Sequence, residues 1–320
     1  MPAVFRAFLF TLASTAFVAP VSRGAAPPPA VGGLILVDAA GKEHQLRGYK
    51  FTAGTRRLGW LAAPGKPSSA PEALVVRDEM KFHFLAGVLT LVPLDRVRSI
   101  EFDADKTTMT VRVVTSAKPE EDVTLAGTTA YKGINKLAVE AEVDRGEAGV
   151  AEVTFQGGTL RGGIRAVRFP APRPEAGAGG RPAVVVTADR DARRTFRVHD
   201  LQPLYQVRDG GERRSPLLLF RKTLRVDVAR VAKITTTDDD GDDPVWRVIG
   251  KDGDDSSLTL LPSGTIDGAA ATLVGLVGRV PAGYALFPVR RIREIHFDTT
   301  EPPAEEKPRD KDDRGDKGVR

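Results

Sequence analysis

The sequence predicts an all-β protein in which one unit is present twice. Apolar residues alternate or form short β-branched runs, as at 34–37, 109–114 and 245–249. Clusters of Gly, Pro and Asp bound these runs, which is typical of strands. No stretch keeps a helical period over three turns, so helices are not expected as major elements. The third observation is an internal repeat.

The repeat is clearest in segment 92–103, Val-Pro-Leu-Asp-Arg-Val-Arg-Ser-Ile-Glu-Phe-Asp. It returns as segment 287–298, Phe-Pro-Val-Arg-Arg-Ile-Arg-Glu-Ile-His-Phe-Asp. Weaker versions lie at 226–235 and 164–169. The central apolar residues of the four versions follow one another at nearly regular intervals: Ile100, Val167, Ile234 and Ile295.

Longer matches indicate that the larger repeating unit is half of the chain. Three pairs of like residues are separated by the same number of positions: Val113 and Val248, Gly133 and Gly268, Val139 and Val274. The Pro-, Gly- and Ala-rich stretch 170–182 has the composition of a linker. We therefore expect two duplicated β domains, 31–169 and 183–298, each long enough for a core of its own.

The repeated segment has a local physical interpretation. Leu94, Val97 and Ile100 recur at every third residue, as a 3₁₀ turn requires, and Ile100 and Phe102 then alternate as in a strand. A strand, a 3₁₀ turn and a final strand resemble the way SH3-like and Sm-like small β-barrels close. This resemblance covers only the closing segment of each module and implies no function. It implies that each half is a pair of small SH3-like barrel or β-sandwich modules.

The first residues indicate export. Arg6 is followed by an uncharged apolar run, 7–19, and then by small residues up to Ala26. This pattern predicts a signal peptide at 1–26, because the run is shorter than the about 20 residues of a membrane span. No later segment has the apolar length of a span. The expected location is periplasmic or extracellular.

Composition excludes several kinds of chemistry. The chain has no cysteine, which rules out disulfides, a lipid anchor on cysteine, thiolate zinc sites and iron–sulfur ligation. Once Arg6 and Arg23 leave with the signal peptide, the charge is close to neutral. Aromatic residues make up 6% of the chain, so few rings are available to stack on bases, and nucleic acid is an unlikely partner by composition. Residues 299–320 are charged and Pro-rich, which predicts a disordered tail.

Metal sites are weakly indicated and no cofactor is expected. The four histidines have no metal-binding spacing: His44, His83, His199 and His296. The best cation candidate is the acidic loop with Asp238, Asp240 and Asp242, but it does not fit the EF-hand pattern. Its Asp-Gly dipeptide favours a solvated hairpin tip instead.

Two basic pairs are the speculative ligand-binding candidates: Arg96 with Arg98, and Arg291 with Arg293. Paired arginines could bind an acidic glycan, a phosphate or an acidic protein. The favoured interpretation is a soluble face that discourages edge-to-edge aggregation, with Arg98 and Arg293 pointing to solvent. Asp95, Glu101 and Asp103 lie close by in sequence and are expected to neutralise the first pair.

The expected function is that of an exported, non-catalytic binding or scaffold protein of the cell envelope or extracellular space, with a protein or glycan partner. No Gly-x-Ser-x-Gly, Walker A or GxGxxG motif is present in a suitable context. One alternative is a hydrolase with a site in the groove between the two halves. A second is a nucleic-acid or acidic-polymer binding module.

Overall fold

The structure, a computed structural model, describes residues 33–63, 66–77, 87–103, 108–116, 118–128, 137–144, 150–156, 163–174, 179–189, 192–208, 211–236 and 244–301. Strands hold 67% of the described residues and helices 8%, with no helix of seven residues or more. The all-β prediction is therefore confirmed. The expected signal peptide, the acidic loop with Asp238, Asp240 and Asp242, His83 and most of the expected tail lie outside the described residues.

The described residues of the first half, 33–174, form eleven strands. They are β1 (Leu34–Asp38), β2 (Glu43–Ala53), β3 (Thr55–Arg57), β4 (Glu72–Arg77), β5 (Leu89–Pro93), β6 (Val97–Phe102), β7 (Thr108–Val113), β8 (Val123–Thr128), β9 (Ala138–Asp144), β10 (Val150–Gln156) and β11 (Ile164–Arg168). Antiparallel pairing follows the order β5–β4–β8–β7–β6–β11–β1–β2–β9–β10, and β3 pairs with β4.

The second half, 179–301, holds the remaining strands. They are β12 (Pro182–Asp189), β13 (Ala192–Val207), β14 (Glu212–Arg214), β15 (Leu217–Leu219), β16 (Arg225–Asp227), β17 (Val231–Thr236), β18 (Val245–Gly250), β19 (Asp255–Thr259), β20 (Ser263–Ile266), β21 (Ala269–Val280), β22 (Gly283–Phe287) and β23 (Ile292–Phe297).

Pairing in the second half follows the order β16–β15–β19–β18–β17–β23–β12–β13–β21–β22. β15 and β19 are joined by an isolated antiparallel β-bridge between Phe220 and Leu260, the residues that follow these strands. β14 pairs with β13 and β20 with β21. Several sheets result, and none of them closes into a barrel.

In each half the first hairpin pairs with late strands. β1 and β2 form a hairpin through a short turn, where Asp38 Oδ1 accepts hydrogen bonds from the amides of Ala40 and Lys42, each 2.9 Å long. This hairpin pairs with β11 and β9, whereas the hairpin β7–β8 pairs with the earlier strands β6 and β4. The order of pairing in the second half is the same, with β12–β13 on β23 and β21.

The predicted 3₁₀ turns are present. Turn η3 (Leu94–Arg96) joins β5 to β6, and η7 (Val289–Arg291) joins β22 to β23. The strands that follow carry the central apolar residues of the repeat, and Ile100 lies opposite Val167 while Ile234 lies opposite Ile295. All four are fully buried, in one main core for each half.

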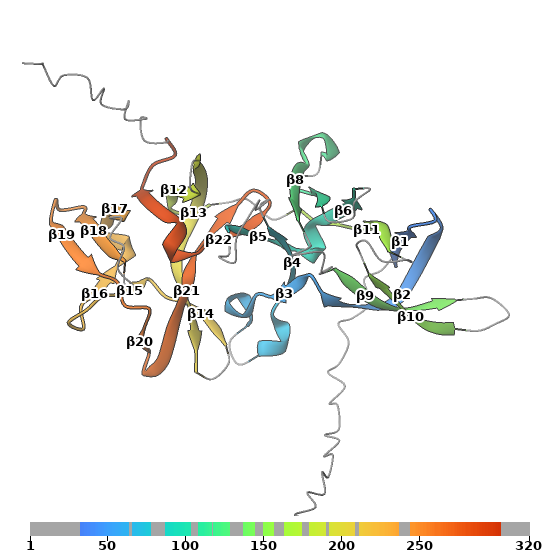
Figure 1. Ribbon diagram of the computed structural model, residues 1–320, viewed down its shortest axis with the longest axis horizontal. Coiled ribbons are helices and arrows are strands. Elements are labelled where there is room, and N and C mark those ends of the chain that lie inside the picture. The colour runs from blue at the N-terminus through green and yellow to red at the C-terminus, as the bar shows by residue number, and fades with distance from the viewer. Residues whose placement is uncertain are drawn as a thin grey trace, which may run out of the picture.

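The two halves lie side by side along the longest axis and share one strand pairing (Figure 1). β5 of the first half pairs with β22 of the second, Leu91 opposite Tyr284 and Leu89 opposite Leu286. Gly283 allows the close approach, because its φ is +146° and a Cβ there would lie 2.4 Å from the Leu91 carbonyl oxygen. Leu91, Tyr284 and Leu286 belong to a separate small core between the halves.

Candidate functional site

The first basic pair is built into the packing of the protein. Arg96 is only 5% exposed. Its Nη2 donates to the Pro281 carbonyl oxygen at 2.6 Å and to the Val114 carbonyl oxygen at 3.4 Å. Because Pro281 follows β21, this contact links the two halves. The expected soluble face is therefore wrong for Arg96.

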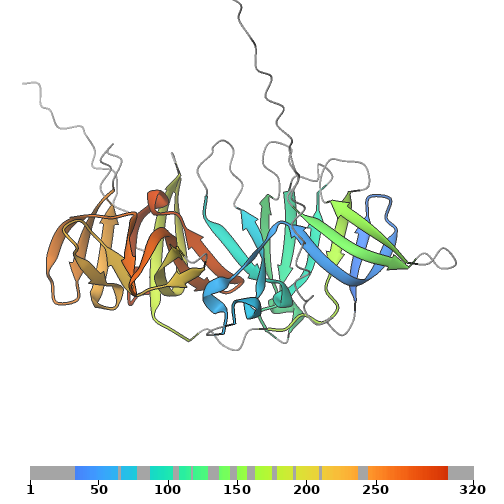
Figure 2. The ribbon, with the colours of Figure 1, turned by 90° about the horizontal axis from the view of Figure 1, so that it is seen from below.

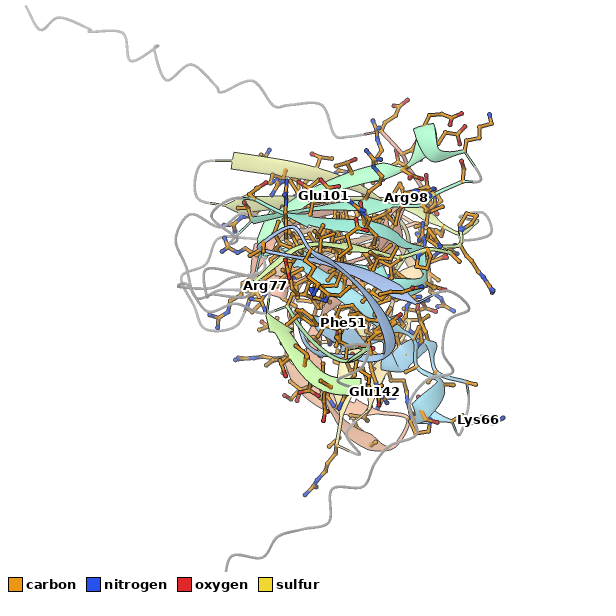
Figure 3. All side chains as sticks on the ribbon, turned by 90° about the vertical axis from the view of Figure 1, so that its right-hand side faces the viewer. Phe51, Lys66, Arg77, Arg98, Glu101 and Glu142 are labelled. Atoms are coloured by element: carbon orange, nitrogen blue, oxygen red, sulfur yellow. The ribbon has the colours of Figure 1, made fainter. Side chains whose placement is uncertain are left out.

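Arg98 has a partner that the sequence did not indicate. Its Nε donates to Asp122 Oδ2 at 2.5 Å, and the Asp122 side chain is 3% exposed while that of Arg98 is 34% exposed. Asp122 lies just before β8, two strands from β6 across β7. Figure 3 shows Arg98 and Glu101 along the same margin of the molecule. Arg98 thus pairs with a buried carboxylate from the loop before β8.

The second pair lies in the other half and in a different place in the order of strands. Arg291 is in η7 and Arg293 in β23, and both are partly buried. In the first half β6 pairs with β11, and in the second half β17 pairs with β23. The two arginine pairs therefore lie in different halves, one at η3 and β6 and the other at η7 and β23.

Two histidines form local pairs with carboxylates. His44 Nε2 lies 2.8 Å from Asp38 Oδ2, and this hydrogen bond holds the pKa of Asp38 below its usual value. His296 Nε2 lies 2.9 Å from Glu294 Oε2. Burial raises the pKa of Glu294, but His296 and two nearby cations outweigh it and lower that pKa. No group of three or more His, Asp or Glu within the described ranges is arranged to hold a metal ion.

A polar cluster that the sequence did not indicate lies at the junction of the halves. Arg56 of β3 forms an ion pair with Glu212 of β14, and its guanidinium lies 6.0 Å from the centre of the Trp60 ring. Trp60 packs edge-on against Tyr284. Burial lowers the pKa of Arg56. Each half thus contributes one charge to a partly buried ion pair across the junction.

Arg181, which the sequence analysis did not single out, ties the end of the linker to the second half. Arg181 donates to both carboxylate oxygens of Asp298, from Nε at 2.7 Å and from Nη2 at 2.8 Å. It also donates to the carbonyl oxygens of Val228 and Val231, and it covers the Phe297 ring at 4.6 Å. These hydrogen bonds hold the pKa of Asp298 well below its usual range. Arg181 and Asp298 are far apart in the sequence, so spacing along the chain does not reveal their contact.

Comparison with known proteins adds no relative. No protein-family model matches the chain, and neither the curated proteins nor the solved structures contain a match. Within the described residues, no helix has the length and apolar character needed to cross a membrane.

Proposed function

We propose that this chain is a non-catalytic scaffold or binding protein whose two halves arose by duplication of one β unit. The observation that carries the proposal is the common order of pairing. The pairings among β1, β2, β6, β9, β10 and β11 recur in the second half among β12, β13, β17, β21, β22 and β23, taken in the same order. The matching burial of the four central apolar residues supports it further.

Each half is in turn proposed to consist of two modules that exchange their opening hairpins. β5, η3 and β6 have the strand, 3₁₀ turn and closing strand that resemble SH3-like proteins. The hairpin that completes their sheet is β7–β8, while the hairpin β1–β2 completes the sheet of β9, β10 and β11. Exchange makes the two modules of a half interdependent, as a scaffold that must keep its shape requires.

A disulfide test addresses the exchange directly, because the chain has no cysteine of its own. Ile35 and Arg168 lie opposite each other on β1 and β11. The variant Ile35→Cys/Arg168→Cys should oxidise to an intrachain disulfide. The control Ile35→Cys/Ser99→Cys should not, because β11 lies between β1 and β6. If the control forms the disulfide and Ile35→Cys/Arg168→Cys does not, β1 pairs with β6 and each module keeps its own hairpin.

The proposal of a non-catalytic role rests on the contacts that the polar side chains make. Arg56, Arg96, Arg98 and Arg181 each bind groups of this same chain. We expect mature protein to be retained by cell-envelope fractions, or by an isolated protein or glycan from them, without turnover of ester, peptide, phosphate or glycoside substrates. Turnover that is lost on substitution of Glu212 would favour the hydrolase alternative. Retention on nucleic acid that weakens steeply with salt would favour the third hypothesis.

Export is part of the proposal and has a separate test. Mass spectrometry of periplasmic or secreted protein should find a mature N-terminus between Pro20 and Pro27. Soluble cytosolic protein that retains Met1 would contradict it.

A further inference from the structure

The junction between the halves holds buried N–H donors as well as the ion pair described above. Turn η1 (Gly59–Leu61) of the first half packs against β14 of the second, and a Cβ on Gly59 would lie 3.6 Å from the Glu212 amide nitrogen. Both views place the blue turns of the first half at its boundary with the second (Figures 1 and 2). Turn η1 thus carries Trp60 to the junction, where its ring packs on Tyr284.

Within the described residues, two buried N–H groups at this junction have no hydrogen-bond acceptor: Trp60 Nε1 and Arg214 Nε. Tyr284 is a common neighbour of both side chains. Its ring centre lies 6.2 Å from that of Trp60, and its phenol influences the pKa of Arg214. Buried polar groups in folded proteins are almost always paired, so two such donors close together indicate a place for an acceptor from outside the chain.

Two guanidinium groups come close together at the same place. Arg214 Nη2 donates to the backbone carbonyl oxygen of Asp200, and Arg279 Nη1 lies 3.8 Å from the Asp200 carboxylate. Burial lowers the pKa of Arg214 and the positive charge of Arg279 lowers it further, while Asp200 and Tyr284 oppose this change. Arg214 is thus partly buried beside a like charge. A negatively charged ligand at this place would relieve the repulsion between the two arginines.

The placement of these donors favours a phosphate group over a carboxylate. They come from three elements: Trp60 from η1, Arg214 from β14 and Arg279 from β21. A phosphate group offers acceptor oxygens in several directions, whereas the two oxygens of a carboxylate lie in one plane. Arginine also forms strong, charge-assisted hydrogen bonds with phosphate. Each of the three side chains is partly exposed, so a ligand can reach the cluster from solvent.

We propose that the junction binds a phosphate group, which accepts hydrogen bonds from Trp60 Nε1, Arg214 Nε and the guanidinium of Arg279. The site gives a ligand class to the binding function proposed above and rests on that function in expecting no turnover, but it does not depend on the duplication. Trp60 belongs to the first half and both arginines to the second. A bound phosphate therefore links the halves and stabilises the folded chain in proportion to its occupancy.

Intrinsic fluorescence can report on the site, because the chain has only two tryptophans. Inorganic phosphate should change the fluorescence saturably, and sodium chloride of equal ionic strength should not. A response to glucose 6-phosphate as well would assign the site to a phosphorylated glycan, and a response to inorganic phosphate alone would assign it to the free ion. Trp60→Phe should remove the response, whereas Trp246→Phe, in the core of the second half, should keep it. Equal saturation by sodium acetate would overturn the assignment to phosphate.

Calorimetric titration with inorganic phosphate tests the arginine. Arg214→Gln should raise the Kd about tenfold, because it removes a charged donor. Arg213→Gln is the matched control: Arg213 is the neighbouring residue on β14, its side chain is 53% exposed and it pairs with Asp267, so the Kd should not change. A parent protein that binds no phosphate, or an Arg214→Gln variant that binds as tightly as Arg213→Gln, overturns the site and leaves the duplication standing. Hydrolysis of glucose 6-phosphate would instead contradict the non-catalytic function.

Discussion

Removing Arg98 should destabilise the protein far more than a surface arginine would. The variant Arg98→Ala leaves the Asp122 carboxylate, whose side chain is 3% exposed, without the guanidinium that binds it at 2.5 Å. Breaking a fully buried ion pair from one side costs about 3–5 kcal/mol. Arg98 is itself 34% exposed, so water can reach the vacated position and reduce that cost. We expect the free energy of unfolding to fall by about 1–3 kcal/mol.

Urea unfolding followed by far-ultraviolet circular dichroism measures this change. Arg168→Ala is the matched control, because Arg168 pairs with Glu43 at 2.8 Å while both side chains are more than half exposed. The control should stay within about 0.5 kcal/mol of the parent protein. Amide hydrogen exchange should locate the effect of Arg98→Ala in β6 and β8.

A double variant separates the ion pair from other effects of the truncation. Arg98→Ala/Asp122→Asn removes both charges, so it should be more stable than Arg98→Ala alone. The reasoning is refuted if Arg98→Ala is as mild as Arg168→Ala. It is also refuted if neutralising Asp122 recovers none of the loss.

Three other changes have expected outcomes. Ile295→Ala, in the core of the second half, should cost about 2–5 kcal/mol in urea unfolding. Arg181→Ala should cost about 2–4 kcal/mol, because it loses Asp298, two carbonyl oxygens and the Phe297 ring together, whereas the exposed Arg193→Ala should cost within about 0.5 kcal/mol. Burial raises the pKa of Tyr205 to about 12 from 10.0, so the stability that the neutral phenol contributes is complete below pH 10 and is lost as pH rises toward 12. Alkaline unfolding curves should show this loss, and Tyr205→Phe should remove it.

The features that the sequence predicted are those set by neighbouring residues. Alternating side chains define strands, and a three-residue apolar spacing defines the 3₁₀ turns η3 and η7. The burial of Ile100 and Ile295 follows from the same local pattern and is confirmed. Within one strand and the turn before it, the local sequence pattern is sufficient to predict the structure.

The partners of polar residues could not be predicted, because they depend on which strands meet. Arg98 was expected in solvent, with acids of its own segment close by, yet it binds Asp122 of the loop before β8. Arg96 was expected on a soluble face, yet it contacts Pro281 of the other half. Both contacts require strand pairings that no spacing along the chain encodes.

The position of the two most similar segments now has a physical explanation. Segments 92–103 and 287–298 begin with the ends of β5 and β22, which pair with each other at the junction. Both therefore must supply an apolar strand, a turn and a closing strand in the same surroundings. The version at 226–235 begins inside β16, which has no such partner among the described strands. The residue just before this segment is Arg225, whereas Leu91 stands just before segment 92–103. A charged residue there protects a free edge from indiscriminate pairing.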